Sequence, residues 1–184
     1  MLSQRARERL LDIARRSVEA AVRGEPAPKF DVQEPELWPH QGAFVTLRTH
    51  GRLRGCIGRF LVRMPLWEVT QQMARASATE DPRFFGMQLK PAELDALEIE
   101  ISVLSPLERT DDPINQMELG KHGIYVKRGH SNGCFLPQVA AEIGWTKEEF
   151  LGQCCSRKAG LAPDAWKDAD TEVYLFTAEV VEQR

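Results

Sequence analysis

Apolar residues recur with the period of an α-helix in three parts of the chain. Between residues 2 and 23 they are spaced i, i+3, i+4, i+7, i+8 and i+11, which predicts an amphipathic helix. A second helix is expected to begin at Pro65 and to stop at Asp81-Pro82. A third follows the capping box formed by Thr146 and Glu149, and it should run from 147 to about 158. Pro137 begins a shorter helix.

Alternation of apolar and polar residues predicts the strands. The clearest alternation covers residues 97–104, where Glu98, Glu100 and Ser102 occupy the polar face. Residues 43–48 and 53–58 read as a hairpin, 123–127 and 133–136 as a second pair, and 171–181 as a closing strand. Helices and strands do not alternate regularly. We therefore predict an α+β fold, with a largely antiparallel sheet flanked by helices.

Size and composition are those of a soluble globular protein. The chain has 184 residues, 42% hydrophobic and 28% charged, with a formal net charge of −3. This length supports one domain over residues 1–184, which can be divided into a larger and a smaller subdomain, without a stabilising metal or disulfide. No apolar run approaches the ~20 residues of a membrane span, and the N-terminus lacks the apolar stretch of a signal peptide. We expect a cytoplasmic protein with no membrane association.

Cysteine, histidine and charge patterns limit the possible functions. The four cysteines form no Cys-x-x-Cys pair, and the histidines are not spaced as metal ligands, so we predict neither a metal nor a cofactor. The slightly negative net charge argues against nucleic-acid binding as the general function. Residues 43–75 hold six arginines against one glutamate, and residues 80–118 hold ten acidic against three basic residues. These segments either pair with each other or the first guides an anionic ligand.

The most unusual local sequence surrounds a cysteine. Cys56 lies between Gly55 and Gly58, with Arg54 and Arg59 close by in the chain. Glycines allow a ligand to approach the backbone, and neighbouring cations stabilise a thiolate, so Cys56 is a candidate nucleophile. The same pattern is also consistent with a small apolar residue buried in a strand.

Several motifs resemble the AMME chromosomal region gene 1 protein family, the AMMECR domain, of the type called AmmeMemoRadiSam system protein A. They run in order over nearly the whole chain: Gly42-Ala43-Phe44-Val45-Thr46-Leu47, Leu53-Arg54-Gly55-Cys56-Ile57-Gly58, Asp81-Pro82-Arg83-Phe84, Ile99-Glu100-Ile101-Ser102-Val103-Leu104-Ser105, Leu119-Gly120-Lys121-His122-Gly123, Leu136-Pro137-Gln138-Val139, Phe150-Leu151 and Lys158-Ala159-Gly160-Leu161. The resemblance implies an intracellular α+β fold with a smaller subdomain. It also implies Memo-like and radical-SAM proteins as pathway partners. Arg59 departs from the small hydroxyl residue common in this family.

Three functional hypotheses follow. In the first, the protein is a cysteine-dependent hydrolase or transferase acting on a small anionic or carbonyl-containing molecule, with Cys56 as nucleophile, His122 as base and Glu100 as acid or orienting group. The substrate would contact Arg54, Gly55, Gly58 and Arg83, although Arg83 can instead fix a turn. The second is an adaptor that binds protein or nucleic acid without catalysis. The third gives the cysteine motif a packing role only.

One expectation concerns the orientation of Arg54. Because Arg54 and Cys56 are two residues apart on a predicted strand, their side chains should share one face. An arginine there needs a carboxylate or a bound anion, and Glu100 is the favoured partner.

Overall fold

The computed structural model describes residues 1–183, and these form two compact units. Unit 1 contains Met1–Leu104 together with the C-terminal segment from Glu179, and unit 2 is Ser105–Ala178. Each unit is built around its own antiparallel sheet with helices, which confirms the predicted α+β class. The chain therefore passes between the units twice.

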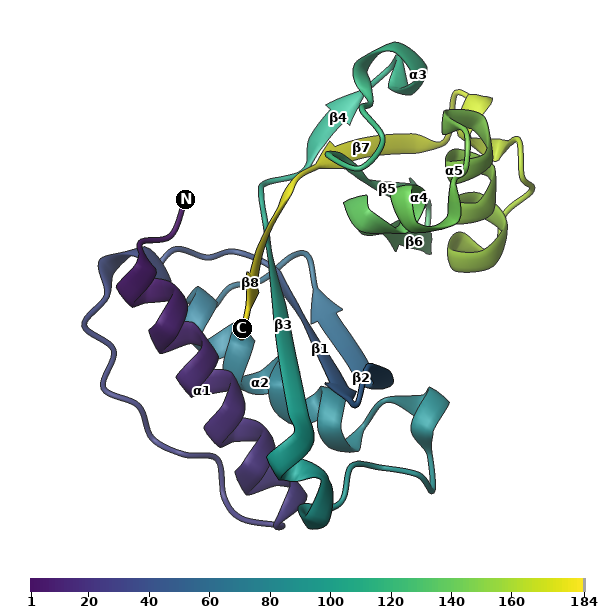
Figure 1. Cartoon of the computed structure of the whole chain (residues 1–184). Helices are drawn as coiled ribbons and strands as arrows, with labels where there is room; N and C mark the ends of the chain where they lie inside the picture. Colours follow the sequence, from purple (N-terminus) through teal and green to yellow (C-terminus); the bar gives the residue numbers. More distant parts are fainter. Residues whose placement is uncertain (184) are drawn as a thin grey trace. The chain divides into compact units, whose positions relative to one another are not determined.

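Unit 1 consists of a four-stranded sheet and two long helices (Figure 1). The strand order is β2-β1-β3-β8, with bounds β1 Ala43–Thr49, β2 Arg52–Arg59, β3 Leu97–Leu104 and β8 Ala178–Glu182. The helices are α1 Gln4–Val22 and α2 Leu66–Thr79, and short 3-10 segments cover Pro35–Leu37 (η1), Pro82–Phe84 (η2) and Pro91–Ala96 (η3). The tight turn between β1 and β2 uses left-handed backbone at His50 (φ 50°) and Gly51 (φ 72°).

The two faces of the unit 1 sheet differ in chemistry. Helices α1 and α2 pack on one face, where apolar residues of β1 and β3 such as Val45 and Ile101 are fully buried. The other face carries the alternate residues, among them Thr46, Cys56 and Glu100. The period-two pattern of the sequence therefore separates a hydrophobic core from a face that bears polar side chains.

Unit 2 is smaller and has a second four-stranded sheet, in the order β4-β7-β5-β6. Its strands are β4 Glu108–Thr110, β5 Gly123–Arg128, β6 Ser131–Phe135 and β7 Glu172–Phe176, and its α-helices are α3 Pro113–Gln116, α4 Pro137–Ile143 and α5 Lys147–Cys154. The predicted capping box of α5 is present: the Thr146 hydroxyl accepts from the Glu149 N–H, and the Glu149 carboxylate accepts from the Thr146 N–H. Phe150 lies fully buried and stacks on Phe135 in the core of this unit.

Two of the predicted elements are corrected by the structure. The single strand expected over 171–181 is two strands, β7 in the second sheet and β8 in the first, separated at the exposed Thr177. The alternation of buried and exposed residues expected of one strand fails there, because the consecutive residues Leu175 and Phe176 are both buried. The helix expected to reach 158 ends as α5 at Cys154 and continues as a π-helical turn, Cys155–Ala159.

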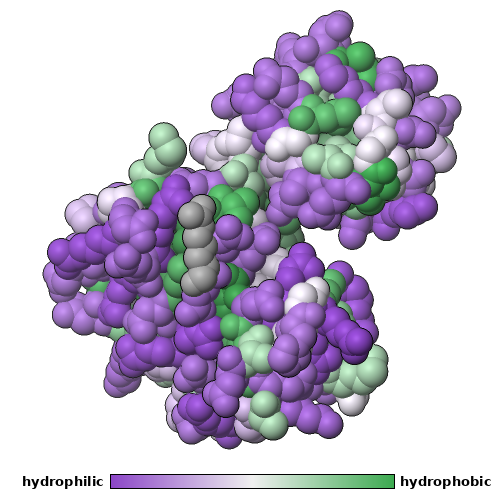
Figure 2. Space-filling model, in the orientation of Figure 1, coloured by the Kyte–Doolittle hydropathy of each residue, from purple (hydrophilic) through white to green (hydrophobic). Residues whose placement is uncertain are grey.

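Hydrophilic residues cover most of the face shown in Figure 2, with apolar residues in small patches. Within residues 1–183, no helix is both long and apolar enough to span a membrane. Strongly exposed apolar side chains include Leu61, Phe85 and Met87.

Candidate functional site

The backbone of Cys56 is held by an ion pair at the edge of the unit 1 sheet. Cys56 lies on β2, an edge strand, and its N–H donates to the Asp81 carboxylate at 2.9 Å. Its carbonyl accepts from Nη2 of Arg83 at 3.2 Å. Arg83 also donates to both carboxylate oxygens of Asp81, at 3.0 and 2.7 Å. The two side chains thus take the place that a further strand would occupy next to Cys56.

The ion pair places a buried carboxylate beside a half-exposed guanidinium. The side chain of Asp81 is 2% exposed and that of Arg83 is 54% exposed. Burial alone would raise the pKa of Asp81, but hydrogen bonds from the Arg83 side chain and from the Cys56 and Arg83 backbone outweigh it and lower that pKa. The pKa of Arg83 is raised, mainly by Asp81 and also by the Cys56 side chain. Arg83 is therefore the cation that faces the thiol.

The sulfur of Cys56 has a second polar neighbour. Cys56 is half-buried, and its Sγ accepts a hydrogen bond from the Thr46 hydroxyl at 3.3 Å. The other thiols differ in their surroundings: Cys134 is half-buried in unit 2, and Cys154 and Cys155 are fully buried there. Burial raises the pKa of both Cys154 and Cys155. Cys56 thus combines partial exposure with an adjacent guanidinium and an adjacent hydroxyl.

Polar side chains form one row across all four strands of this sheet. Thr46 of β1 is directly opposite Cys56 on one side and Glu100 of β3 on the other. The bond from Gln183 N–H to the Ile99 carbonyl places Glu182 of β8 opposite Glu100. Adjacent members of the row have Cα atoms ~5 Å apart. The Asp81–Arg83 ion pair therefore stands at one end of the row, and the carboxylates of Glu100 and Glu182 stand at the other.

A shallow pocket of about 160 Å³ lies beside Thr46 at the acidic end of the row. Glu98, Glu100 and Glu182 line it together with Arg48. This pocket suits an amine or a hydroxyl group better than an anion. The other end of the row holds Arg83, whose Nε and Nη2 donate to Asp81 and to the Cys56 carbonyl.

Packing accounts for both glycines that flank Cys56. A Cβ atom at position 55 would come within 1.9 Å of the Ser77 carbonyl oxygen of α2, and one at position 58 within 2.2 Å of the Phe44 ring. Both spaces are therefore filled by the protein itself. The contact of Gly55 and Gly58 with a substrate stays a prediction, and the glycines need no ligand to explain them.

The expected position of Arg54 is corrected. The register between β1 and β2 shifts between Leu47 and Arg48, which leaves Arg54 as an extra residue of a bulge, and period-two parity does not hold across a bulge. The carboxylate partner is Glu93 of η3 instead of Glu100, with Nη2 of Arg54 at 3.0 Å from Oε2. Burial would raise the pKa of Glu93, but bonds from the Lys90 backbone and from Arg54 lower it.

The remaining predicted residue belongs to the other unit. His122 belongs to unit 2, where its Nδ1 accepts from the backbone N–H of Glu118 at 3.0 Å. Cys56, Glu100 and Arg83 all belong to unit 1. In the part of the chain that the structure describes, no group of three or more His, Cys, Asp or Glu side chains is arranged to hold a metal ion.

Sequence reasoning missed Thr46, Asp81 and Glu182 as members of the site. Thr46 and Asp81 stand in the motifs on which the family resemblance was based, but only strand pairing brings them to Cys56. Glu182 had no signal, because the predicted closing strand ended at residue 181 and left it outside.

Comparison with known proteins identifies relatives over nearly the whole chain. The AMMECR1 family model matches residues 11–181. Protein TK0174 of Thermococcus kodakarensis is 45% identical over 186 residues, covering 96% of this chain and 89% of the relative, and protein NEQ441 of Nanoarchaeum equitans is 41% identical over 180 residues, covering 95% and 98%. The crystal structure of protein PH0010 from Pyrococcus horikoshii superposes with a TM-score of 0.88 at 42% identity, covering 96% of this chain and 91% of that one.

Proposed function

The chain belongs to the AMMECR1 family, and from this premise we propose that it is a thiol-dependent enzyme in which Cys56 attacks a small carbonyl-containing substrate. The observation that carries the proposal is the position of the sulfur. A half-buried thiol accepts a hydrogen bond from Thr46 and faces the guanidinium of Arg83. Donors and cations beside a sulfur favour its thiolate, the form that attacks a carbonyl carbon, and a cation near the carbonyl oxygen stabilises the negative charge that develops there.

Each residue of the row has a role in this proposal. The sulfur of Cys56 forms a bond to the carbonyl carbon while the π bond of the carbonyl breaks and its electron pair moves to the oxygen, close to Arg83. When the carbonyl re-forms, the bond to the leaving group breaks, and that group departs with the proton that the thiol has given up. In the structure the Thr46 hydroxyl donates to the sulfur. For proton transfer it turns to accept from the thiol S–H and donates its own proton to Glu100, the next residue of the row, which leaves a thiolate and a protonated carboxyl group. Asp81 positions Arg83. The role of base assigned to His122 from sequence stays a prediction, since the proposal uses residues of unit 1 only.

The charge along the row specifies the class of substrate. Arg83 at one end favours a carboxylate or another anionic group, and the pocket with Glu98, Glu100 and Glu182 favours an amine or hydroxyl group. The substrate we propose is therefore a small bipolar molecule whose carbonyl lies between an anionic and a hydrogen-bond-donating end.

Iodoacetamide labelling at neutral pH tests the role of Arg83. Mass spectrometry of partially labelled protein should rank Cys56 first among the four thiols, and Arg83→Gln should slow its labelling about tenfold, the effect of a ~1.4 kcal/mol loss. Arg59→Gln is the matched control, because Arg59 is an exposed arginine on the same strand. It should change the rate less than about twofold. Equal rates in the two variants would contradict the proposal, as would faster labelling of another thiol.

A chromogenic ester tests catalysis directly. Reaction with p-nitrophenyl acetate should release a burst of p-nitrophenolate and leave an acetyl group on Cys56, which intact mass spectrometry detects. Cys56→Ser should abolish this burst, whereas Cys134→Ser, which changes the other half-buried thiol, should preserve it. A burst that persists in Cys56→Ser removes the nucleophile from the proposal.

Exposed apolar residues next to the site favour a second candidate, an adaptor for another protein. Phe85 and Met87 follow the Asp81–Arg83 turn and are 83% and 59% exposed. In an adaptor, binding would survive Cys56→Ser and be lost on Phe85→Ser. The enzyme requires the opposite result for turnover, so the same two variants distinguish the candidates.

A further inference from the structure

The two edges of the unit 1 sheet differ in whether their outward main-chain groups have hydrogen-bond partners. At the β2 edge, the outward N–H and carbonyl of Cys56 are satisfied by Asp81 and Arg83. At the opposite edge lies β8, the last strand in the order β2-β1-β3-β8. An edge strand presents main-chain donors and acceptors to any further strand that can reach them.

Hydrogen bonds at the ends of β8 show which residues point outward. Gln183 donates to the carbonyl of Ile99, and the carbonyl of Thr177 accepts from Ser105. These bonds fix an antiparallel pairing with β3, in which odd-numbered residues of β8 turn their main chain toward β3. The N–H and carbonyl groups of Val180 and Glu182 therefore point away from the sheet.

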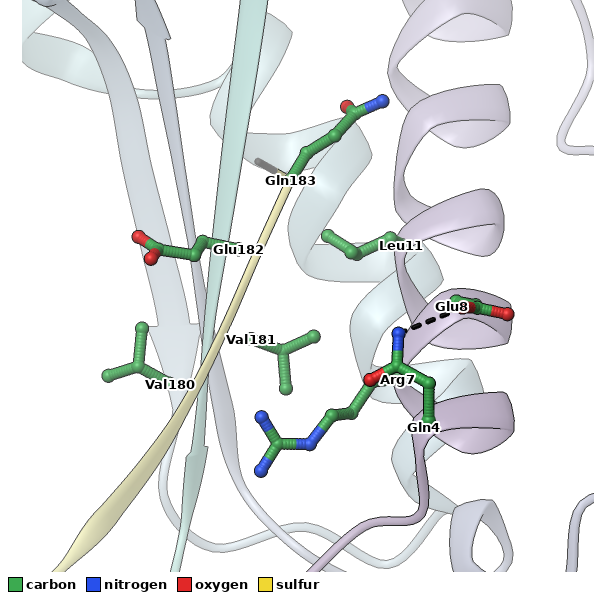
Figure 3. Close-up of a pocket in the computed structure, with 8 residues that line it drawn as sticks. All are labelled: Gln4, Arg7, Glu8, Leu11, Val180, Val181, Glu182 and Gln183. Carbon is green, nitrogen blue, oxygen red and sulfur yellow. Dashed lines mark hydrogen bonds between the residues drawn. The ribbon is translucent and has the colours of Figure 1, made fainter.

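A groove of about 480 Å³ runs beside this strand (Figure 3). One wall is Val180–Gln183 of β8, and the other is formed by residues of the first turns of α1, namely Gln4, Arg7, Glu8 and Leu11. In Figure 3 the side chains of Val181 and Leu11 extend toward each other between strand and helix, while Val180 and Glu182 project to the other side of the strand. A groove between an edge strand and a helix is a geometry in which extended peptides bind by adding a strand.

The charges that line the groove define the occupant. Arg7 donates to Glu179 at 2.5 Å and is neutralised by that carboxylate. Glu8 and Glu182 line the groove, are exposed and have no basic partner among the described residues. Glu8 on α1 and Glu182 on the opposite face of β8 are thus acidic positions on the two sides of the outward main chain of β8, and Leu11 is an aliphatic position on the helix side.

We propose that the groove between α1 and β8 binds an extended, lysine- or arginine-containing segment of a partner protein, which pairs as a fifth strand with Val180 and Glu182. Aliphatic side chains of that segment pack on Leu11, and its basic side chains pair with Glu8 and Glu182. This interaction surface shares Glu182 with the pocket described above but contains neither Cys56 nor Arg83, and it goes beyond the proposed function.

A second copy of the chain is a poorer occupant. Antiparallel pairing through these outward groups sets even-numbered residues of one copy opposite even-numbered residues of the other, so the Glu182 side chains of both copies lie on the same face of the joined sheet, and directly opposite each other where Glu182 pairs with Glu182. Like charges directly opposite each other destabilise an antiparallel pair.

Titration with a fluorescent peptide of alternating valine and lysine tests the proposal. Val180→Pro removes an outward N–H and leaves the bonds to β3 in place, so it should weaken binding about tenfold. Val180→Ala keeps that N–H and should weaken binding less than about threefold. Glu8→Lys should also weaken binding, and Cys56→Ser should leave it unchanged. Equal affinities of the proline and alanine variants, or no binding by the wild-type protein, overturn the proposal.

Methylation of the peptide backbone keeps the test decisive if Val180→Pro does not fold. In an added strand every second amide points to β8, and the amides between them point away. N-methylation of the amides that point to β8 should therefore abolish binding, whereas N-methylation of the amides that point away should not. Equal loss with both sets overturns the proposal. Sedimentation velocity supplies the last outcome: a concentration-dependent dimer that Val180→Pro abolishes would identify a second copy as the occupant and refute a partner segment.

Discussion

Removal of the Asp81 carboxylate should destabilise unit 1 and release the backbone of Cys56. Asp81→Ala deletes the acceptor of the Cys56 N–H and the partner of Arg83. A hydrogen bond to a buried charged acceptor contributes ~1.5–3 kcal/mol. The pair with Arg83 adds at most about 1 kcal/mol, because the guanidinium is half-exposed. We expect a loss of about 2–4 kcal/mol in the free energy of unfolding.

The loss should depend on pH in a defined direction. The pKa of Asp81 is lowered in the folded protein, so its charged form is bound more favourably than in the unfolded chain. The stabilisation is therefore complete above the unfolded pKa of about 3.9 and disappears as the pH falls through the lower, folded pKa. Asp81→Asn, which cannot ionise, should lack this part of the acid dependence.

Urea denaturation measures the global loss, and hydrogen exchange of peptides from β2 measures the local one. Asp81→Ala should speed exchange at the Cys56 amide more than elsewhere in unit 1. Asp95→Ala is the control, because Asp95 is an exposed aspartate of unit 1, and it should stay within about 0.5 kcal/mol of wild type. An Asp81→Ala variant that also stays within that limit would refute the argument that this carboxylate secures the edge of the sheet.

Three further predictions concern packing, thiols and metal. Gly55→Ala should cost more than ~2 kcal/mol in urea denaturation, since its Cβ would lie 1.9 Å from a backbone oxygen, whereas Gly86→Ala, at a φ of 79° with open space around it, should cost only about 1 kcal/mol. Cys154 should resist iodoacetamide in the folded protein and react in urea, because burial raises its pKa; labelling of the native thiol at the rate of Cys56 would contradict this. Melting temperature should be unchanged by EDTA or by a reductant, and a fall of more than a few degrees with either would show that the core is not sufficient.

Local sequence signals predicted most elements of the fold. The 3.6-residue period identified α1 and α2, and period two identified β3 with its bounds. Capping residues located the start of α5, because the Thr146–Glu149 box acts within a single turn. These predictions succeed because the interactions that determine them connect residues close together in the sequence.

The candidate site was predicted only in part, for the same physical reason. The sequence singled out Cys56 and Arg83. It explained Gly55 and Gly58 by the close approach of a ligand, whereas Ser77 and Phe44 fill the space beside these glycines. The bulge at Arg54 adds one residue to β2, and a change of one residue is enough to invalidate an argument from parity.

The sequence by itself determined which residues face a core, where helices begin and which family the chain resembles. Only the tertiary structure decided that the last predicted strand is divided between two sheets, and that Thr46, Glu100 and Glu182 extend a row from Cys56. Helical and strand periodicity is fixed by backbone geometry within a few residues. Strand neighbours and ion pairs such as Asp81 with Arg83 at the Cys56 backbone depend on contacts between distant segments, and these form only when hydrophobic burial brings the segments together.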